Sequence, residues 1–215
     1  MRTSADVTDQ LRQDILGSVF TPGERLIELQ LSETYGVGRA AIRSALVELD
    51  KEGLVERSTN RGATVRRVPL SEAIQLTEAR QALESLAAAC AAANASQEAR
   101  VELQELAVEM RSAVESENYV YYSELNGVLH RRLCEESGHK IAAELIANLK
   151  ARASHHEFRL ALRPGRPAES LPQHEAIIAA VVAGNSDAAR AAMNSHLESV
   201  IATLQDWQTI GVSPH

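Results

Sequence analysis

Apolar residues recur every three to four positions along most of this chain, which is the spacing of amphipathic helices. In the N-terminal third, the pattern predicts a helix over residues 7–18, a second ending at Tyr35 and a third over 39–52, with a short extended segment at 25–27. The pattern then changes. Leu54–Arg57 and Ala63–Val65 favour two strands joined by a tight turn.

From residue 71 onward the helical spacing continues, and no segment shows the two-residue alternation of a strand. Ser, Asn, Gly and Pro residues mark the helix ends. Six helices are predicted, over residues 71–93, 96–116, 118–137, 139–162, 171–183 and 186–207. The sequence thus predicts a mainly α protein, with an N-terminal winged helix-turn-helix domain that carries a small β-hairpin wing (1–67), a linker (68–70) and an all-α antiparallel helical bundle (71–210).

The segment from Glu28 to Gly62 has the spacing of a helix-turn-helix followed by a wing. Gly36 is the residue type that tolerates the positive φ of a tight turn. Arg39 and Arg43 then lie one helical turn apart on the helix that would enter a major groove, where a guanidinium fork can bind guanine O6 and N7. An ordinary surface helix with two solvated arginines is the alternative interpretation.

The net charge of −7 at first disfavours a nucleic-acid partner, but the charges are unevenly distributed. Residues 1–67 carry ten basic and ten acidic side chains, and residues 39–67 carry seven basic against four acidic. Basic charge is therefore concentrated where the second helix and the wing are expected. Two widely separated cysteines, and no apolar run near the roughly 18 residues of a membrane span, favour a reduced, cytoplasmic protein.

Three of the seven histidines belong to separate predicted helices of the second half. His130 follows Asn126 by one helical turn, so these two side chains project from one face, while His174 and His196 lie on later helices. Neutral imidazoles inside a helical bundle can bind zinc or nickel. Histidines so far apart in sequence are also consistent with ordinary core or surface positions.

The N-terminal motifs resemble the DNA-binding domain of GntR-family transcription regulators. The resemblance covers about residues 7–67 and rests on Phe20–Leu26, Gly36–Leu46, Glu52–Val55 and Asn60–Gly62. It implies that Arg39, Arg43 and the wing-tip pair Arg61 and Gly62 contact DNA. The chain departs from the family at Gly38, Ala40 and Ala41, where Ser, Thr and Pro are common, so two hydroxyls that can bind phosphate are missing.

The second half resembles the FCD-like C-terminal ligand-binding domain of the FadR-type branch of that family, in its six-helix form. The motifs are Glu78–Glu84, Leu125–His130, His174–Ala180 and Ala191–Leu197. The resemblance implies a metal site formed by Asn126, His130, His174 and His196, and an effector contact at Arg80. An amide at position 126 adds no negative charge to the ion, which favours an anionic effector. A buried pair with Glu84 is the alternative role of Arg80.

We therefore expect a cytoplasmic, homodimeric transcription regulator, acting as a repressor, that binds a double-stranded DNA operator and does not associate with membranes. The expected effector is a small organic or sugar acid, and the expected cofactor is a non-catalytic divalent ion, zinc or nickel. Two alternatives remain. One is a metal-free regulator with an organic pocket. The other is a zinc-dependent hydrolytic enzyme with Glu175 as general base. Against this alternative, the sequence has no His-Glu-x-x-His run and no nucleophile turn.

Overall fold

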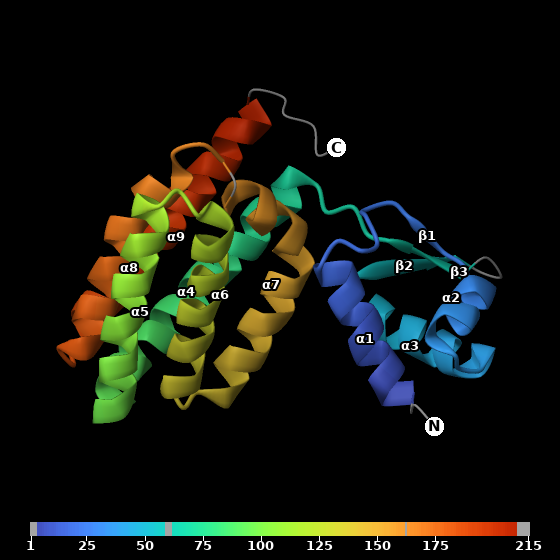
Figure 1. Cartoon of the computed structure of the whole chain (residues 1–215), viewed down its shortest axis with the longest axis horizontal. Helices are drawn as coiled ribbons and strands as arrows, with labels where there is room; N and C mark the ends of the chain where they lie inside the picture. Colours follow the sequence, from blue (N-terminus) through green and yellow to red (C-terminus); the bar gives the residue numbers. More distant parts are fainter. Residues whose placement is uncertain (1–3, 59–61, 162, 210–215) are drawn as a thin grey trace. The chain divides into compact units, whose positions relative to one another are not determined.

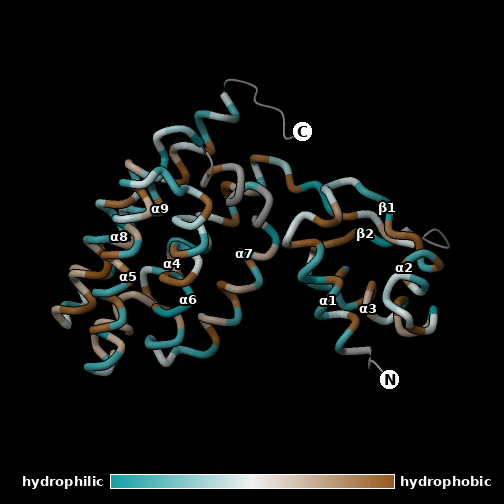
Figure 2. Tube along the Cα trace, in the orientation of Figure 1, coloured by the Kyte–Doolittle hydropathy of each residue, from teal (hydrophilic) through white to brown (hydrophobic). Residues whose placement is uncertain are grey.

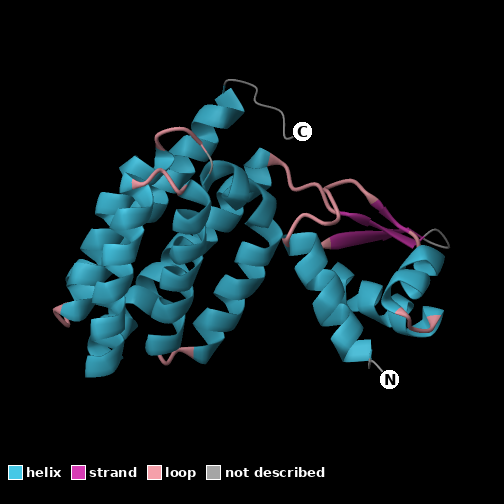
Figure 3. Cartoon of the chain, in the orientation of Figure 1, coloured by secondary structure: helices cyan, strands magenta, loops and turns pink. Residues whose placement is uncertain are grey.

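The computed structural model describes residues 4–58, 62–161 and 163–209, and the chain divides into two compact units between Pro69 and Leu70. The three strands form one antiparallel sheet in the order β1-β3-β2, so the extended segment before the first helix of the motif pairs with the hairpin. In chain order, the first unit contains α1 (Ser4–Leu16), β1 (Arg25–Leu26), α2 (Glu28–Tyr35), α3 (Arg39–Lys51), β2 (Val55–Ser58) and β3 (Gly62–Val65) (Figures 1 and 3).

A small aliphatic core holds the first unit together. Leu11 of α1, Leu26 of β1 and Ile42 of α3 are fully buried, and α1 packs against α3. Hydrophobic and hydrophilic residues alternate along these helices in Figure 2, as burial of one face requires. Val19, which the four-residue spacing places on the buried face of the first helix, is instead exposed because α1 ends at Leu16.

The turn between α2 and α3 follows from its two glycines. Gly36 has a φ of 66° and ends α2 by donating its amide hydrogen to the carbonyl of Ser32. The Ser32 hydroxyl in turn donates to the carbonyl of Val37 at 2.5 Å. Gly38 is extended and occupies the N-cap of α3, where it offers the helix no side-chain acceptor. The turn fixes the start of α3 and places Arg39 in its first turn.

The second unit is a helical bundle built around α4. This helix packs against α6, α7, α8 and α9, and its many buried alanines allow its neighbours to approach closely. The predicted N-caps of two helices are present, since Ser96 accepts from the amide of Ala99 and Asn118 from that of Tyr121. The described helices are α4 (Leu70–Asn94), α5 (Gln97–Glu115), α6 (Tyr119–Glu136), α7 (Lys140–Ala161), α8 (Arg166–Val182) and α9 (Ser186–Thr209) (Figure 1).

The mainly α architecture with a small antiparallel sheet agrees with the fold class predicted from the sequence. Helix α4 begins at Leu70, which the prediction assigned to the linker. Within the described ranges, none of the helices combines the length and apolar character needed to cross a membrane.

The start of α8 differs most from the prediction. We expected a helix from residue 171 because Pro167 was interpreted as a helix breaker, but α8 begins at Arg166. A proline in the first helical turn removes an N–H that has no intrahelical partner, so Pro167 is compatible with the start of a helix. The earlier start places Arg166, Ser170 and His174 at four-residue intervals, and therefore on one face of α8.

Candidate nucleic-acid interface and metal centre

Helix α3 presents two arginines at the surface of the first unit. The side chains of Arg39 and Arg43 are 61% and 56% exposed. One carboxylate, that of Glu28 at the start of α2, contacts both. Arg43 donates to it from Nε and Nη2, at 3.1 and 2.8 Å, and Arg39 Nη2 lies 3.6 Å from it. Glu28 of α2 thus contacts both arginines of α3.

The geometry of this contact leaves Arg43 able to bind another group. The hydrogen bonds from Arg43 hold the pKa of Glu28 below its ordinary value, so the carboxylate stays charged. A guanidinium bonded through its Nε–Nη2 edge keeps its Nη1–Nη2 edge, which is an edge that can meet guanine O6 and N7. Glu28 can therefore orient Arg43 without blocking it. Glu28 was not predicted from the sequence, because contacts between α2 and α3 have no signature in helical spacing.

The predicted wing-tip residues differ in how far the structure describes them. Arg61 lies outside the described residues. Gly62 begins β3 with a φ of 81°, and a Cβ atom added there would lie 2.4 Å from the carbonyl oxygen of Leu26 in β1. Glycine at this position is therefore required for the sheet itself, because any side chain would meet the backbone of the neighbouring strand.

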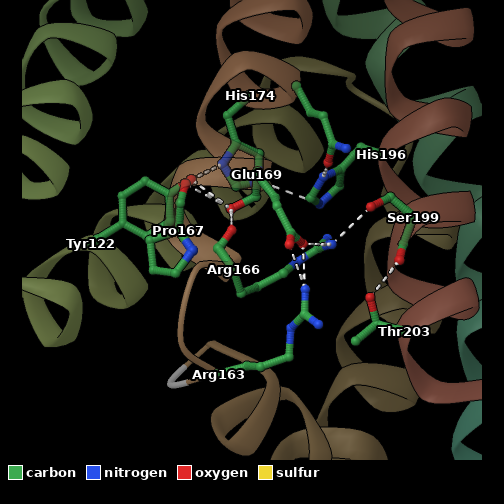
Figure 4. Close-up of polar contacts among 11 residues, drawn as sticks. Tyr122, Arg163, Arg166, Pro167, Glu169, His174, His196, Ser199 and Thr203 are labelled. Carbon is green, nitrogen blue, oxygen red and sulfur yellow. Dashed lines mark hydrogen bonds and ion pairs between the residues drawn. The ribbon is translucent and has the colours of Figure 1, made fainter. Parts of the chain in front are cut away.

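The structure brings the three predicted histidines together inside the second unit. His130 comes from α6, His174 from α8 and His196 from α9, and each is at most 4% exposed. One ring nitrogen of each can be chosen so that all three lie within 4.8 Å of one another. The Nε2 atoms of His174 and His196 are 3.3 Å apart (Figure 4).

Each of these imidazoles is held from behind through its Nδ1 atom. Nδ1 of His130 contacts the carboxylate of Glu84, and Nδ1 of His196 lies 2.9 Å from Oε1 of Gln173. Both partners are acceptors, so both Nδ1 atoms carry hydrogen. Outer partners of this kind orient metal-binding histidines in proteins. Because Nδ1 of His130 and of His196 carries the ring hydrogen, the Nε2 atom of each neutral ring has a lone pair that can bind a metal.

A chain of hydroxyls fixes the third ring in the same way. The Ser170 hydroxyl donates to the carbonyl of Arg166 at 2.9 Å, within its own helix. Its oxygen can then accept from the Tyr122 hydroxyl at 2.9 Å, and in that arrangement the Tyr122 oxygen accepts from Nδ1 of His174 at 2.8 Å (Figure 4). Nε2 of His174 is then the ring nitrogen that can bind a metal.

This arrangement suits a cation between the rings. The Nε2 atoms of His174 and His196 lie within hydrogen-bond distance of each other, and a cation bound by both would take the place of that hydrogen bond. Metal–nitrogen bonds of about 2.05 Å are compatible with a nitrogen separation of this size. Burial lowers the pKa of His174 and His196 well below the ordinary value, and the neighbouring imidazoles lower it further. The neutral form, which is the form that binds metals, is therefore favoured.

Asn126, the fourth predicted ligand, lines the same cavity one helical turn before His130. Its Oδ1 atom is buried and has no hydrogen-bond partner among the described residues. An orphaned acceptor beside three imidazoles is compatible with a bound cation. The amide is half-buried and belongs to the face of α6 that also carries Tyr122.

Arg80, the predicted effector contact, lines this cavity and is also paired with Glu84. Its Nε donates to Oε1 of Glu84 at 2.7 Å, and both side chains are buried. Burial alone would raise the pKa of Glu84, but the charge of Arg80, followed by His130, holds it well below its usual range. Glu84 therefore remains a carboxylate that joins Arg80 to His130. The buried pair, which the sequence offered as the alternative role of Arg80, is present, and the effector contact stays a prediction.

A winged helix-turn-helix with exposed arginines on its second helix, in one chain with a helical bundle whose cavity is lined by polar side chains, is the architecture of a DNA-binding regulator. The family profile described as "Bacterial regulatory proteins, gntR family" matches residues 3–65, and the "FCD domain" profile matches residues 75–199. The chain belongs to the GntR family of DNA-binding transcription regulators and carries an FCD domain.

Relatives over nearly the whole chain agree with this assignment. The HTH-type transcriptional repressor RspR of Escherichia coli (strain K12) is 27% identical over 88% of this chain and 83% of its own length. The HTH-type transcriptional repressor NanR of Citrobacter rodentium (strain ICC168) is 29% identical over 98% and 87%. The solved structure of E. coli McbR/YncC matches with a TM-score of 0.81 and 23% identity, covering 97% of this chain and 99% of that one, which shows a shared fold.

The family and these relatives are transcription regulators, so this protein is a regulator and not an enzyme. The hydrolytic alternative considered from the sequence is not supported. Neither the family profiles nor the relatives' descriptions identify a metal, an effector or an operator, and the FadR-type assignment stays a prediction.

Proposed function

We propose that this protein is a homodimeric repressor whose second unit binds a divalent metal ion and a small organic acid, and that this binding changes its affinity for the operator. The observation that carries the proposal is the convergence of three imidazoles whose Nδ1 atoms are all occupied. One ring nitrogen of each lies within 4.8 Å of the other two, and neutral nitrogen ligands of this kind suit zinc or nickel.

His130, His174 and His196 would hold the ion, with Asn126 Oδ1 as the fourth protein ligand. When bound, the ion would supply a positive charge that attracts an anion to its remaining coordination positions. The described side chains that line the cavity strengthen this preference. Arg80 and Lys150 are among them, and none is Asp or Glu. A carboxylate is the effector group that these charges favour.

We infer that Arg39, Arg43, Arg61 and Gly62 form the DNA-reading surface. One winged domain makes few base contacts, so two copies related by a two-fold axis would read two half-sites and gain affinity through their linkage. An effector that binds more tightly to the arrangement unable to span both half-sites would release the operator. A cytoplasmic location follows from this function.

The experiment that tests the proposal has two readouts on tag-free protein. Elemental analysis measures the zinc and nickel content of the wild type, of His174→Ala and of His139→Ala. His139 is an exposed histidine outside the cluster and serves as the matched control. We expect about one ion per wild-type and His139→Ala chain, and loss of the ion in His174→Ala.

The second readout is fluorescence anisotropy with a duplex selected from genomic fragments. We expect salt-dependent binding of this duplex, and weaker binding when a carboxylic acid and the metal are present together. Stoichiometric metal in a double variant lacking both His130 and His196 would rule out the site described. Equal affinity for every duplex would rule out operator recognition. Effector control without any metal would favour the metal-free regulator.

A further inference from the structure

Arg166, the first residue of α8, is a buried cation whose hydrogen-bonding capacity is not filled. It is 4% exposed, and its Nη1 donates to Ser199 Oγ at 2.8 Å. Nη2 is buried and has no hydrogen-bond partner within the described part of the chain. Figure 4 shows the side chain running beneath His174 and His196 toward Ser199. A buried guanidinium donor without a partner is costly, so its presence needs an explanation.

The nearest carboxylate, that of Glu169, forms an ion pair with Arg166 but no hydrogen bond. Oε2 of Glu169 lies 3.6 Å from Nη1 of Arg166, beyond hydrogen-bond distance. Both oxygens of Glu169 accept from Nη2 of Arg163 at 2.6 Å, and Glu169 is half exposed. Glu169 is therefore shared between the two arginines and gives its hydrogen bonds to the outer one, so Nη2 of the buried Arg166 is left without an acceptor among the described residues.

Arg166 lines the same cavity as the three histidines. It also stands at the N-terminus of α8, a helix of 17 residues whose positive end adds to its charge. The cavity has a volume of about 70 Å³. At about 10–15 Å³ per water-sized position, this is room for roughly five such positions, of which an ion would take one. A carboxylic acid of two or three carbons fits in a space of this size.

We propose that Arg166 is the anchor for the carboxylate of a small ligand that spans the cavity from the guanidinium to the histidine cluster, and that this ligand is a short-chain acid of two or three carbons. This inference rests on the proposed function and narrows it. The carboxylate would accept from Nη2 and supply the acceptor that Glu169 does not provide. Arg80, whose Nε is bonded to Glu84, would contribute charge at the histidine end.

A purely structural role for Arg166 makes a different prediction. If the guanidinium were present to stabilise the bundle, its removal would lower the melting temperature of ligand-free protein. A buried guanidinium whose Nη2 has no acceptor instead destabilises the ligand-free state. Arg166→Gln is therefore expected to melt at the same temperature as the wild type or higher, and to lose the response to ligand.

The test uses the full-length protein with glycolate as the probe and the uncharged glycolamide as its neutral counterpart. Glycolate affinity is measured by calorimetric titration and by thermal shift, with and without equimolar zinc, for the wild type, Arg166→Gln, Arg166→Lys and Arg163→Gln. Arg163 is the matched control, because it is the neighbouring arginine that binds Glu169 and does not line the cavity. We expect glycolate to stabilise the wild type and glycolamide not to do so.

Relative to the wild type, we expect Arg166→Gln to weaken glycolate binding at least tenfold, Arg166→Lys to weaken it less, and Arg163→Gln to change it less than twofold. Equal glycolate affinity in the wild type and Arg166→Gln overturns the assignment of Arg166, even if the protein binds zinc as proposed. Binding of gluconate but not glycolate to the wild type overturns the short-chain ligand. A failure to bind zinc refutes the metal proposal separately, because the metal-free titrations still decide the role of Arg166.

Discussion

Glu84 offers a sharp test of how the histidine cluster is supported, because its carboxylate joins Arg80 to His130. Glu84 and Arg80 are 2% and 4% exposed, so both charges are shielded from water. Breaking a buried pair by altering one partner costs about 3–5 kcal/mol. In Glu84→Gln the new amide still accepts a hydrogen bond, so we expect the lower end of this range, about 3 kcal/mol.

For a unit of this size, a loss of about 3 kcal/mol lowers the melting temperature by roughly 6–12 °C. The same substitution removes the charge that orients Nδ1 of His130, so zinc affinity is expected to fall about 10- to 100-fold. Scanning calorimetry of the full chain measures the first effect, and competition with a zinc chelator of known affinity measures the second. If the two units unfold in separate transitions, the transition whose temperature rises when zinc is added is that of the second unit.

Glu102→Gln is the matched control, since its ion pair with Arg132 is exposed and is expected to contribute no more than about 1 kcal/mol. Glu84→Gln with unchanged zinc affinity would show that the carboxylate does not position His130. A melting temperature within a degree or two of the wild type would show that the buried pair contributes nothing net to stability. Either result would refute the supporting role assigned to Glu84.

Two further predictions concern the first unit. Glu28→Gln removes the carboxylate that contacts both recognition arginines, so we expect tighter binding to random duplexes, a smaller preference for the operator, and a plot of log K against log salt that is steeper by up to about 0.9 per protomer. The exposed Glu33 on the same helix gives the control Glu33→Gln, and identical salt slopes for the two variants would contradict this role. Gly62→Ala combines a φ of 81° with a Cβ placed 2.4 Å from the carbonyl oxygen of Leu26, and is expected to destabilise the first unit by about 3 kcal/mol in urea unfolding. Gly36→Ala, with a φ of 66° and no atom within 4 Å of the added Cβ, is expected to cost only about 1 kcal/mol, and equal losses in the two variants would show that the contact with Leu26 is unimportant.

Local patterns in the sequence were sufficient for most of the architecture. The residue type at a helix end depends on a few backbone groups close by in the sequence, which need a hydrogen-bond partner or a positive φ. For this reason Gly36, Ser96 and Asn118 correctly marked helix ends. Pro167 misled the prediction for the same reason. Its local effect depends on whether it lies in the first turn or the interior of a helix, and the sequence does not state which.

The histidine cluster was only partly accessible from sequence. Helical spacing placed Asn126 beside His130, but His174 and His196 entered the predicted site through family resemblance. Their approach to 3.3 Å is a result of how α8 packs against α9. Arg166 was missed because the predicted start of α8 excluded it. The four-residue interval from Arg166 through Ser170 to His174 was the available signal.

The sequence alone determined the order and type of the helices and strands, the helix-turn-helix and the face on which its arginines lie, because these depend on the periodicity and backbone preferences of nearby residues. The tertiary structure decided that Glu28 reaches Arg43, that three histidines with a contact on each Nδ1 atom meet in one cavity, and that Nη2 of Arg166 is buried without a partner among the described residues. These features require side chains from different helices to meet within a few ångströms. Such distances are set by the packing of whole helices, which no local pattern encodes.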